Sequence, residues 1–234
     1  MLTDREGSIS VTRIMQFELQ VVLVLLAANA TAWLLGNNFA WIPLDGRLAK
    51  MFLVDHELNV PTLFSVLLLI QASLLSFVAL RCERGNLFWG LLAVVFLALS
   101  LDEMASLHEQ LIRPVREALG VSGFLHFAWI IPGAVFVLIL AILGVKWLRA
   151  LPSDIRRGFI IAAALYLGAV FLLEAVGGWY GSRIGLHDTI WWLLTTTEET
   201  LEMLGLILFG YYAALHIVCN HGLNRIRISV ATEQ

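Results

Sequence analysis

Six stretches of the chain are apolar over lengths that match the thickness of a lipid bilayer. A helix needs about 20 apolar residues to cross the hydrocarbon core, because each residue adds about 1.5 Å. The six stretches cover residues 17–35, 62–80, 87–112, 127–148, 159–175 and 190–216. Hydrophobic residues make up 59% of the chain, which exceeds their usual share in soluble domains. The sequence therefore predicts an all-α, polytopic integral membrane protein with six transmembrane helices in one bundle.

The distribution of positive charge predicts that both termini are cytoplasmic. Short cytoplasmic segments of membrane proteins retain Lys and Arg. With the N-terminus inside, ten of the fifteen Lys and Arg residues lie on inner segments and five on outer ones. We therefore expect a cytoplasmic N-terminal segment at 1–16, a transmembrane domain at 17–219 and a cytoplasmic tail at 220–234. The predicted location is the inner (cytoplasmic) membrane.

Proline and asparagine residues near the ends of the apolar stretches predict where helices begin, end or bend. Asn59 and Pro61 are expected at the start of the second helix, as a cap and a first-turn residue. Pro114 is expected just past the end of the third helix. Pro132, followed by Gly133, falls inside the fourth stretch and is expected to kink it.

Acidic residues are concentrated on the outer side of this topology, which holds twelve of the eighteen Asp and Glu. Asp102, Glu174 and Glu202 come from three different helices, about 21 to 23 Å from the inner end of each. That depth lies inside a hydrocarbon core of about 30 Å. An ionised acid there is unfavourable by about 2.5 kcal/mol or more on insertion scales. These acids must therefore be protonated, paired, hydrated or bound to a cation.

Two short segments supply most of the other polar groups, namely SLDEMASLHEQL (100–111) and TTTEETLE (195–202). In the first, helical spacing predicts that Asp102, Ser106 and Glu109 share one face. In the second, the three Glu follow Thr195 along a comparable stripe. We expect the two faces, with Glu174 between them, to form one polar site that opens away from the cytoplasm.

Carboxylates with one or two imidazoles suit a hard or borderline divalent cation such as Fe, Mn, Zn, Mg or Ca. The sequence therefore predicts a membrane-embedded metalloenzyme, either a hydrolase or an oxidoreductase. Its expected partners are the bilayer and a lipid or small apolar substrate from the outer leaflet. The predicted metal ligands are Asp102, Glu103, His108, Glu174, Glu198 and Glu202, and the predicted catalytic residues are Glu109 and Glu199.

Two other functions stay open. A proton- or cation-coupled transporter or channel also uses acids at mid-membrane depth, but no second polar stripe reaches the cytoplasmic side. A non-catalytic accessory subunit would satisfy the acids with Arg113, Arg183 and nearby hydroxyls. Two arginines cannot neutralise the seven acids of the predicted site, so the metalloenzyme ranks first. Nucleic-acid binding is disfavoured by the net charge of −3 and the lack of a basic face.

Overall fold

The computed structural model describes residues 10–38, 46–83, 85–186 and 188–221. In chain order the elements are α1 (Val11–Asn38), α2 (Arg47–Lys50), α3 (Val60–Cys82), α4 (Leu87–Ala105), α5 (Glu109–Leu119), η1 (Gly123–Leu125), α6 (Ile130–Ala150), α7 (Ser153–Gly168), η2 (Ala169–Leu173), α8 (Glu174–Gly181) and α9 (Thr189–His221). Within these described ranges, six helical stretches are long and apolar enough to cross a membrane: α1, α3, α4, α6, the continuous run from α7 to α8, and α9. Over the described residues the all-α prediction is confirmed, and this architecture indicates a multi-pass membrane protein.

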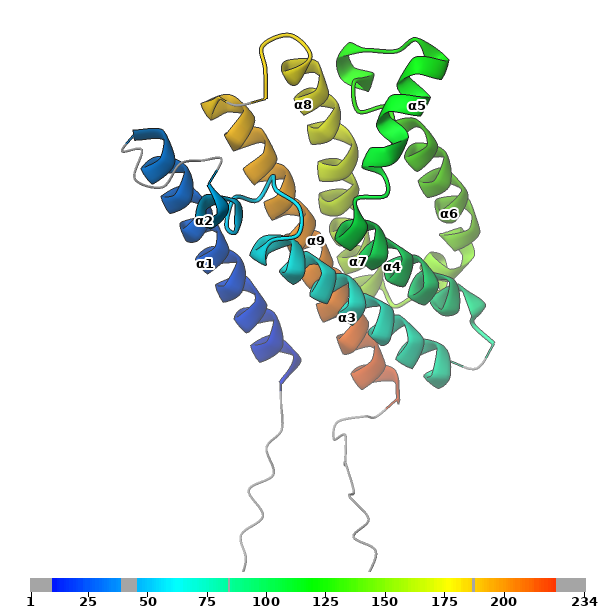
Figure 1. Cartoon of the computed structure of the whole chain (residues 1–234). Coiled ribbons are helices and arrows are strands. Elements are labelled where there is room, and N and C mark those ends of the chain that lie inside the picture. The colour runs from blue at the N-terminus through cyan, green and yellow to red at the C-terminus, as the bar shows by residue number, and fades with distance from the viewer. Residues whose placement is uncertain (1–9, 39–45, 84, 187, 222–234) are drawn as a thin grey trace, which may run out of the picture.

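The bundle has two distinct ends (Figure 1). At the near end α1 begins and α9 ends, and at the far end lie α5 and η1. Most of the predicted terminal segments, at 1–16 and 220–234, lies outside the described residues.

Helix α9 is the central element and packs against α1, α3 and α7. Its buried side chains Met203, Leu206 and Ile207 pack against apolar residues of α1 and α3. On the side of α7 the two backbones approach closely at Gly205, where an added Cβ would lie 2.9 Å from the Ala162 carbonyl oxygen. Only glycine permits this approach without a backbone shift. The acid-bearing part of α9 therefore has a fixed position relative to α7.

The third transmembrane helix is shorter than predicted. Helix α4 ends at Ala105, and Ser106 takes a left-handed conformation with φ of 48°. The Asp102 carboxylate accepts a hydrogen bond from the backbone N–H of His108 at 2.8 Å, which offers the chain an alternative to the helix. The expectation that Asp102, Ser106 and Glu109 share one helix face is therefore wrong. The chain turns at Ser106, and the separate helix α5 begins at Glu109.

The predictions for helix starts, ends and bends have mixed outcomes. The Asn59 side chain caps α3 by accepting a hydrogen bond from the Thr62 N–H at 3.0 Å, and Pro61 lies in the first turn, as predicted. Pro114 lies inside α5 and not beyond a helix end, because the helix restarts at Glu109. Pro132 lies in the first turn of α6, where its missing N–H costs no helical hydrogen bond, so it does not interrupt the helix.

A π-helical turn, η2, joins α7 to α8 and ends directly before Glu174. Such turns are rare and often occur at functional sites, because the extra residue shifts the faces of the helix on either side. The residues before and after η2 therefore do not follow one regular helical register, and nothing in the apolar pattern indicates this shift.

Candidate functional site

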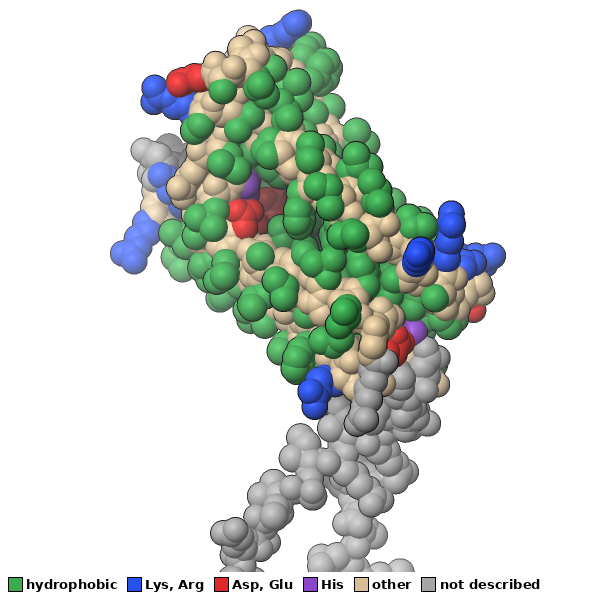
Figure 2. All heavy atoms as spheres, turned by 90° about the vertical axis from the view of Figure 1, so that its right-hand side faces the viewer, with side chains coloured by type: hydrophobic (Ala, Val, Ile, Leu, Met, Phe, Trp, Pro, Cys, Tyr) green, Lys and Arg blue, Asp and Glu red, His purple; other side chains and the backbone are tan. Residues whose placement is uncertain are grey.

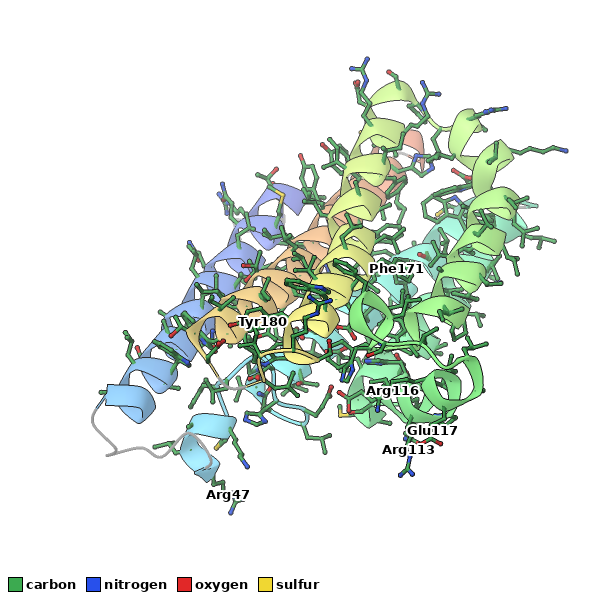
Figure 3. The ribbon with its side chains drawn as sticks, turned by 90° about the horizontal axis from the view of Figure 1, so that it is seen from above. Arg47, Arg113, Arg116, Glu117, Phe171 and Tyr180 are labelled. Atoms are coloured by element: carbon green, nitrogen blue, oxygen red, sulfur yellow. The ribbon has the colours of Figure 1, made fainter. Side chains whose placement is uncertain are left out.

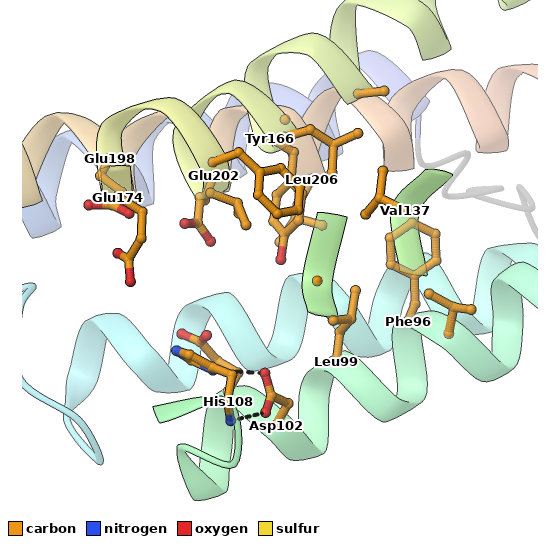
Figure 4. Close-up of a pocket in the computed structure, with 18 of the residues that line it drawn as sticks. Phe96, Leu99, Asp102, His108, Val137, Tyr166, Glu174, Glu198, Glu202 and Leu206 are labelled. Carbon is orange, nitrogen blue, oxygen red and sulfur yellow. Dashed lines mark hydrogen bonds and ion pairs between the residues drawn. The ribbon is translucent and has the colours of Figure 1, made fainter. Parts of the chain in front are cut away.

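A cavity of about 770 Å³ lies between α4, α6, the run from α7 to α8, and α9. Its size is in the usual range of ligand pockets, about 300 to 1,000 Å³. In Figure 4, Glu174, Glu198 and Glu202 face His108 and Asp102 from the opposite wall. The lining includes all eight residues predicted as metal ligands or catalytic groups: Asp102, Glu103, His108, Glu109, Glu174, Glu198, Glu199 and Glu202. The structure brings these residues to one cavity, and their roles stay predictions.

His108 and Asp102 form a close pair where α4 ends. The imidazole Nδ1 lies 2.8 Å from Asp102 Oδ2, while the backbone N–H of His108 donates to Oδ1. Burial disfavours the imidazolium, but the hydrogen bond and charge of Asp102 outweigh burial and raise the pKa of His108 above 6.5. The geometry suits an Nδ1–H that donates to the carboxylate, which leaves Nε2 without a hydrogen-bond partner among the described residues. A histidine oriented in this way can exchange protons with a bound molecule.

Trp129 connects this pair to the opposite wall. Its indole N–H donates to Glu174 Oε1 at 2.8 Å, and its ring centroid lies 4.8 Å from that of His108. Tyr166 also lines the cavity, close to Glu202 in Figure 4. Neither Trp129 nor Tyr166 was predicted from the sequence as a site residue. For Tyr166 the only signal was its position two helical turns before Glu174, and η2 disturbs that register.

Polar contacts outside the cavity fix the start of α9. Asp188 accepts hydrogen bonds from the Tyr180 hydroxyl and, at 2.8 Å, from the Trp191 N–H. These bonds lower the pKa of Asp188, with the Tyr180 bond having the larger effect. Two residues before the first Glu of α9, Thr196 Oγ1 accepts a hydrogen bond at 3.0 Å from the side-chain amide of the buried Asn29 of α1. The three Glu of TTTEETLE therefore stand on a helix that is held at its N-terminus and on its outer side.

The arginines that could pair with the site acids bind elsewhere. Arg113 donates to Glu117 at 2.7 Å, and both side chains project from the edge of the molecule (Figure 3). Arg183 lies over the Trp179 ring, 5.0 Å from its centroid. Within the described part of the chain, no Lys or Arg lines the cavity. Of the nearby hydroxyls, that of Thr195 donates to backbone carbonyl oxygens of its own helix.

The loop between α2 and α3 adds a further acid. Glu57 lines the cavity beside the acids of the α4–α5 turn. Its partial withdrawal from water raises its pKa above 4.5, and a hydrogen bond with Ser106 only partly offsets this effect. Glu57 was not among the site residues predicted from the sequence.

The rest of the cavity is apolar. Phe96 and Leu99 of α4, Val137 of α6 and Leu206 of α9 line the part away from the carboxylates (Figure 4). Further aromatic and aliphatic side chains continue this lining toward the near end, including Phe88 and Phe159. Figure 2 shows a hollow on the side of the molecule, with acidic and histidine side chains inside and hydrophobic side chains around it. The cavity therefore has an acidic end and an apolar arm.

Across residues 10–38, 46–83, 85–186 and 188–221, no three His, Cys, Asp or Glu side chains are arranged so that they could hold a metal ion. The ligand set predicted from the sequence lines the cavity but is spread over its walls. Metal binding therefore stays a prediction that requires these side chains to move toward one another.

A family model described as "Domain of unknown function (DUF8692)" matches residues 19–217, so the chain belongs to this family. The matched range includes every residue that lines the cavity. No curated protein and no solved structure matches the chain.

Proposed function

We propose that this member of the DUF8692 family is a membrane-embedded metalloenzyme of the inner membrane, with its acidic site on the extracytoplasmic side. The observation that carries the proposal is the acidic end of the cavity, which has seven predicted site acids and no Lys or Arg in its described lining. Acids at membrane depth are costly unless something compensates their charge, and they occur mainly where they have a function. A divalent cation is the compensation that fits this set of oxygen ligands.

The chain's own groups support proton transfer at this site. Asp102 holds the His108 imidazole by Nδ1, so Nε2 is available to take a proton from a bound molecule or to return one. On the opposite wall, the Trp129 indole N–H holds the Glu174 carboxylate. A bound dication would supply a Lewis acid that polarises a carbonyl group or activates a water molecule. Hydrolysis of a polar bond is the simplest reaction that needs this combination.

Glu198, Glu199 and Glu202 are the residues best placed to hold the cation. They lie on adjacent turns of α9 and all line the cavity. Glu side chains have three rotatable bonds, so their carboxylates can converge without movement of the helix. Glu103 of α4 and Glu174 of α8 face the same space and would complete the set.

Transport through the cavity is less well supported. A proton or cation pathway needs polar groups along its length. Here the described lining is acidic at the far end but aromatic and aliphatic toward the near end, where Phe88, Trp147 and Phe159 lie. An accessory role based on ion pairs is also less well supported, since Arg113 and Arg183 have partners away from the acids.

Elemental analysis of the purified protein tests the proposal. Protein extracted in mild detergent without chelator should carry a stoichiometric divalent metal. The Glu199→Gln and Glu202→Gln variants should lose most of it, because each removes a charged oxygen ligand. Glu117→Gln is the matched control, since Glu117 is exposed and pairs with Arg113 outside the cavity. Wild-type protein without stoichiometric metal, or variants that retain it, would overturn the metal-binding role.

A further inference from the structure

We infer that the ligand of this cavity is an amphiphile with a long hydrocarbon chain and an uncharged polar head group, which enters sideways from the bilayer. The head-group part rests on the proposed function, since it places the head at the carboxylates and His108. The chain part rests on the shape and lining of the apolar arm. An experiment can therefore overturn the inferred head group and leave the inferred hydrocarbon chain standing, or the reverse.

The apolar arm continues directly from the acidic end. Phe96 and Leu99 lie on the α4 side and Val137 on the α6 side, beyond the carboxylates of Glu174 and Glu202 (Figure 4). A cation with its water ligands fills only a small fraction of about 770 Å³, since each water occupies about 30 Å³. The arm has few groups that bind water, so hydrocarbon is the filling that suits it.

Helix α6 leaves the cavity open at the side. Only Ile130 and Gly144 of this helix are buried, and many of its other side chains are exposed. Phe136 of α6 and Ile160 of α7 line the cavity and are nevertheless 47% and 51% exposed, so part of the cavity wall would contact lipid in a membrane. The hollow in Figure 2 is bordered by hydrophobic side chains. A molecule that reaches the acids by this route passes through the hydrocarbon region, which selects for a lipid-like substrate.

The charge of the lining selects the head group. Phosphate and carboxylate head groups are normally bound by Arg or Lys. Neither residue lines the described cavity, whereas seven predicted site acids do. One dication leaves this set with excess negative charge, so an anionic head group would be repelled. A head group with hydroxyl, ester or amide groups has no such penalty and can accept a hydrogen bond or a metal contact through its oxygen.

Photocrosslinking tests both parts. The purified protein is mixed with a monoacylglycerol that carries a diazirine in its chain, or with a lysophosphatidic acid of the same chain. The monoacylglycerol should label peptides of α4 and α6, and the lysophosphatidic acid should label them much less. The Val137→Trp variant should weaken labelling about tenfold, because the indole displaces several methylenes of the chain from the arm. Leu138→Trp is the matched control, since Leu138 is not among the lining residues.

Each outcome of this experiment is informative. Equal labelling by both lipids would overturn the head-group part. Labelling of the wild type that Val137→Trp leaves unchanged would overturn the chain part, provided that the variant elutes as a monodisperse species. Labelling that depends on Val137 in a protein without metal would keep the chain part and reject the metalloenzyme. A metal-loaded protein that neither lipid labels would keep the metal-binding role and overturn the chain part.

Discussion

Among the described residues, two histidine–carboxylate pairs lie in very different surroundings. At the near end, His216 Nε2 lies 2.5 Å from Glu83 Oε1, and its side chain is 2% exposed. At the far end, His108 pairs with Asp102 at 2.8 Å, and its side chain is 25% exposed. Glu83 also accepts hydrogen bonds from Asn86 and from the Trp89 indole N–H. The near pair is part of a packed core, whereas the far pair borders a cavity.

A buried histidine–carboxylate pair therefore does not by itself indicate chemistry. The Trp89 ring lies 5.6 Å from the His216 ring and belongs to the same core as Phe159 and Phe209. Neither His216 nor Glu83 lines the cavity, so the near pair fastens α9 to the turn between α3 and α4. The far pair keeps one imidazole nitrogen toward a cavity lined by other acids.

The largest expected effect is the loss of stability in Glu83→Ala. The substitution removes the acceptor that holds both the buried His216 and Trp89. Breaking a buried pair by removing one partner costs about 3 kcal/mol, because the remaining polar group stays buried. The free energy of unfolding, measured by titration with a denaturing detergent in mixed micelles, should fall by that amount.

The control for this variant is Glu117→Ala, which removes an exposed ion pair and should cost less than about 0.5 kcal/mol.

The pH dependence of the free energy of unfolding gives a second test of the near pair. Burial opposes ionisation of Glu83, but its hydrogen bonds, above all with His216, outweigh burial and lower its pKa below 4.5. The pair therefore stabilises the fold above about pH 4.5 and loses this contribution as the pH falls through the lowered pKa. Glu83→Ala should lack this acid-side slope, and an identical slope would contradict the structural role.

A smaller effect on stability is expected from Asp102→Asn. The pair it weakens is only partly buried, so the free energy of unfolding should fall by about 1 kcal/mol in the same titration. A loss as large as that of Glu83→Ala would make the two regions equivalent.

Chemical modification also distinguishes the two histidine–carboxylate pairs. Diethyl pyrocarbonate should modify His108 and spare His216 in the folded protein, as peptide mass spectrometry would show, because His108 borders the cavity whereas His216 is buried away from it.

The six apolar helices were predictable because the length of each stretch depends only on hydrocarbon thickness. The grouping of the site acids was also largely predictable, since depth along three helices places them at one level. The break at Ser106 was not, because it depends on an Asp102 carboxylate that leaves helical geometry to bind the His108 N–H. The near pair and η2 were missed for a similar reason. Contacts between distant segments and an extra residue in a helical turn leave no periodic signal in the sequence.

The smallest expected effect belongs to Arg113→Ala, and its small size is informative. The side chains of Arg113 and Glu117 are 81% and 63% exposed, and an exposed pair of this kind contributes less than about 0.5 kcal/mol. If Arg113 instead compensated the acids of the cavity, its removal would leave buried charge unpaired and would cost several times more. The same detergent titration therefore decides whether the chain supplies its own counter-charge at the far end. A small loss means that the acids depend on protons, water or a bound cation, whereas a large loss would make the far end an ion-paired core like the near one.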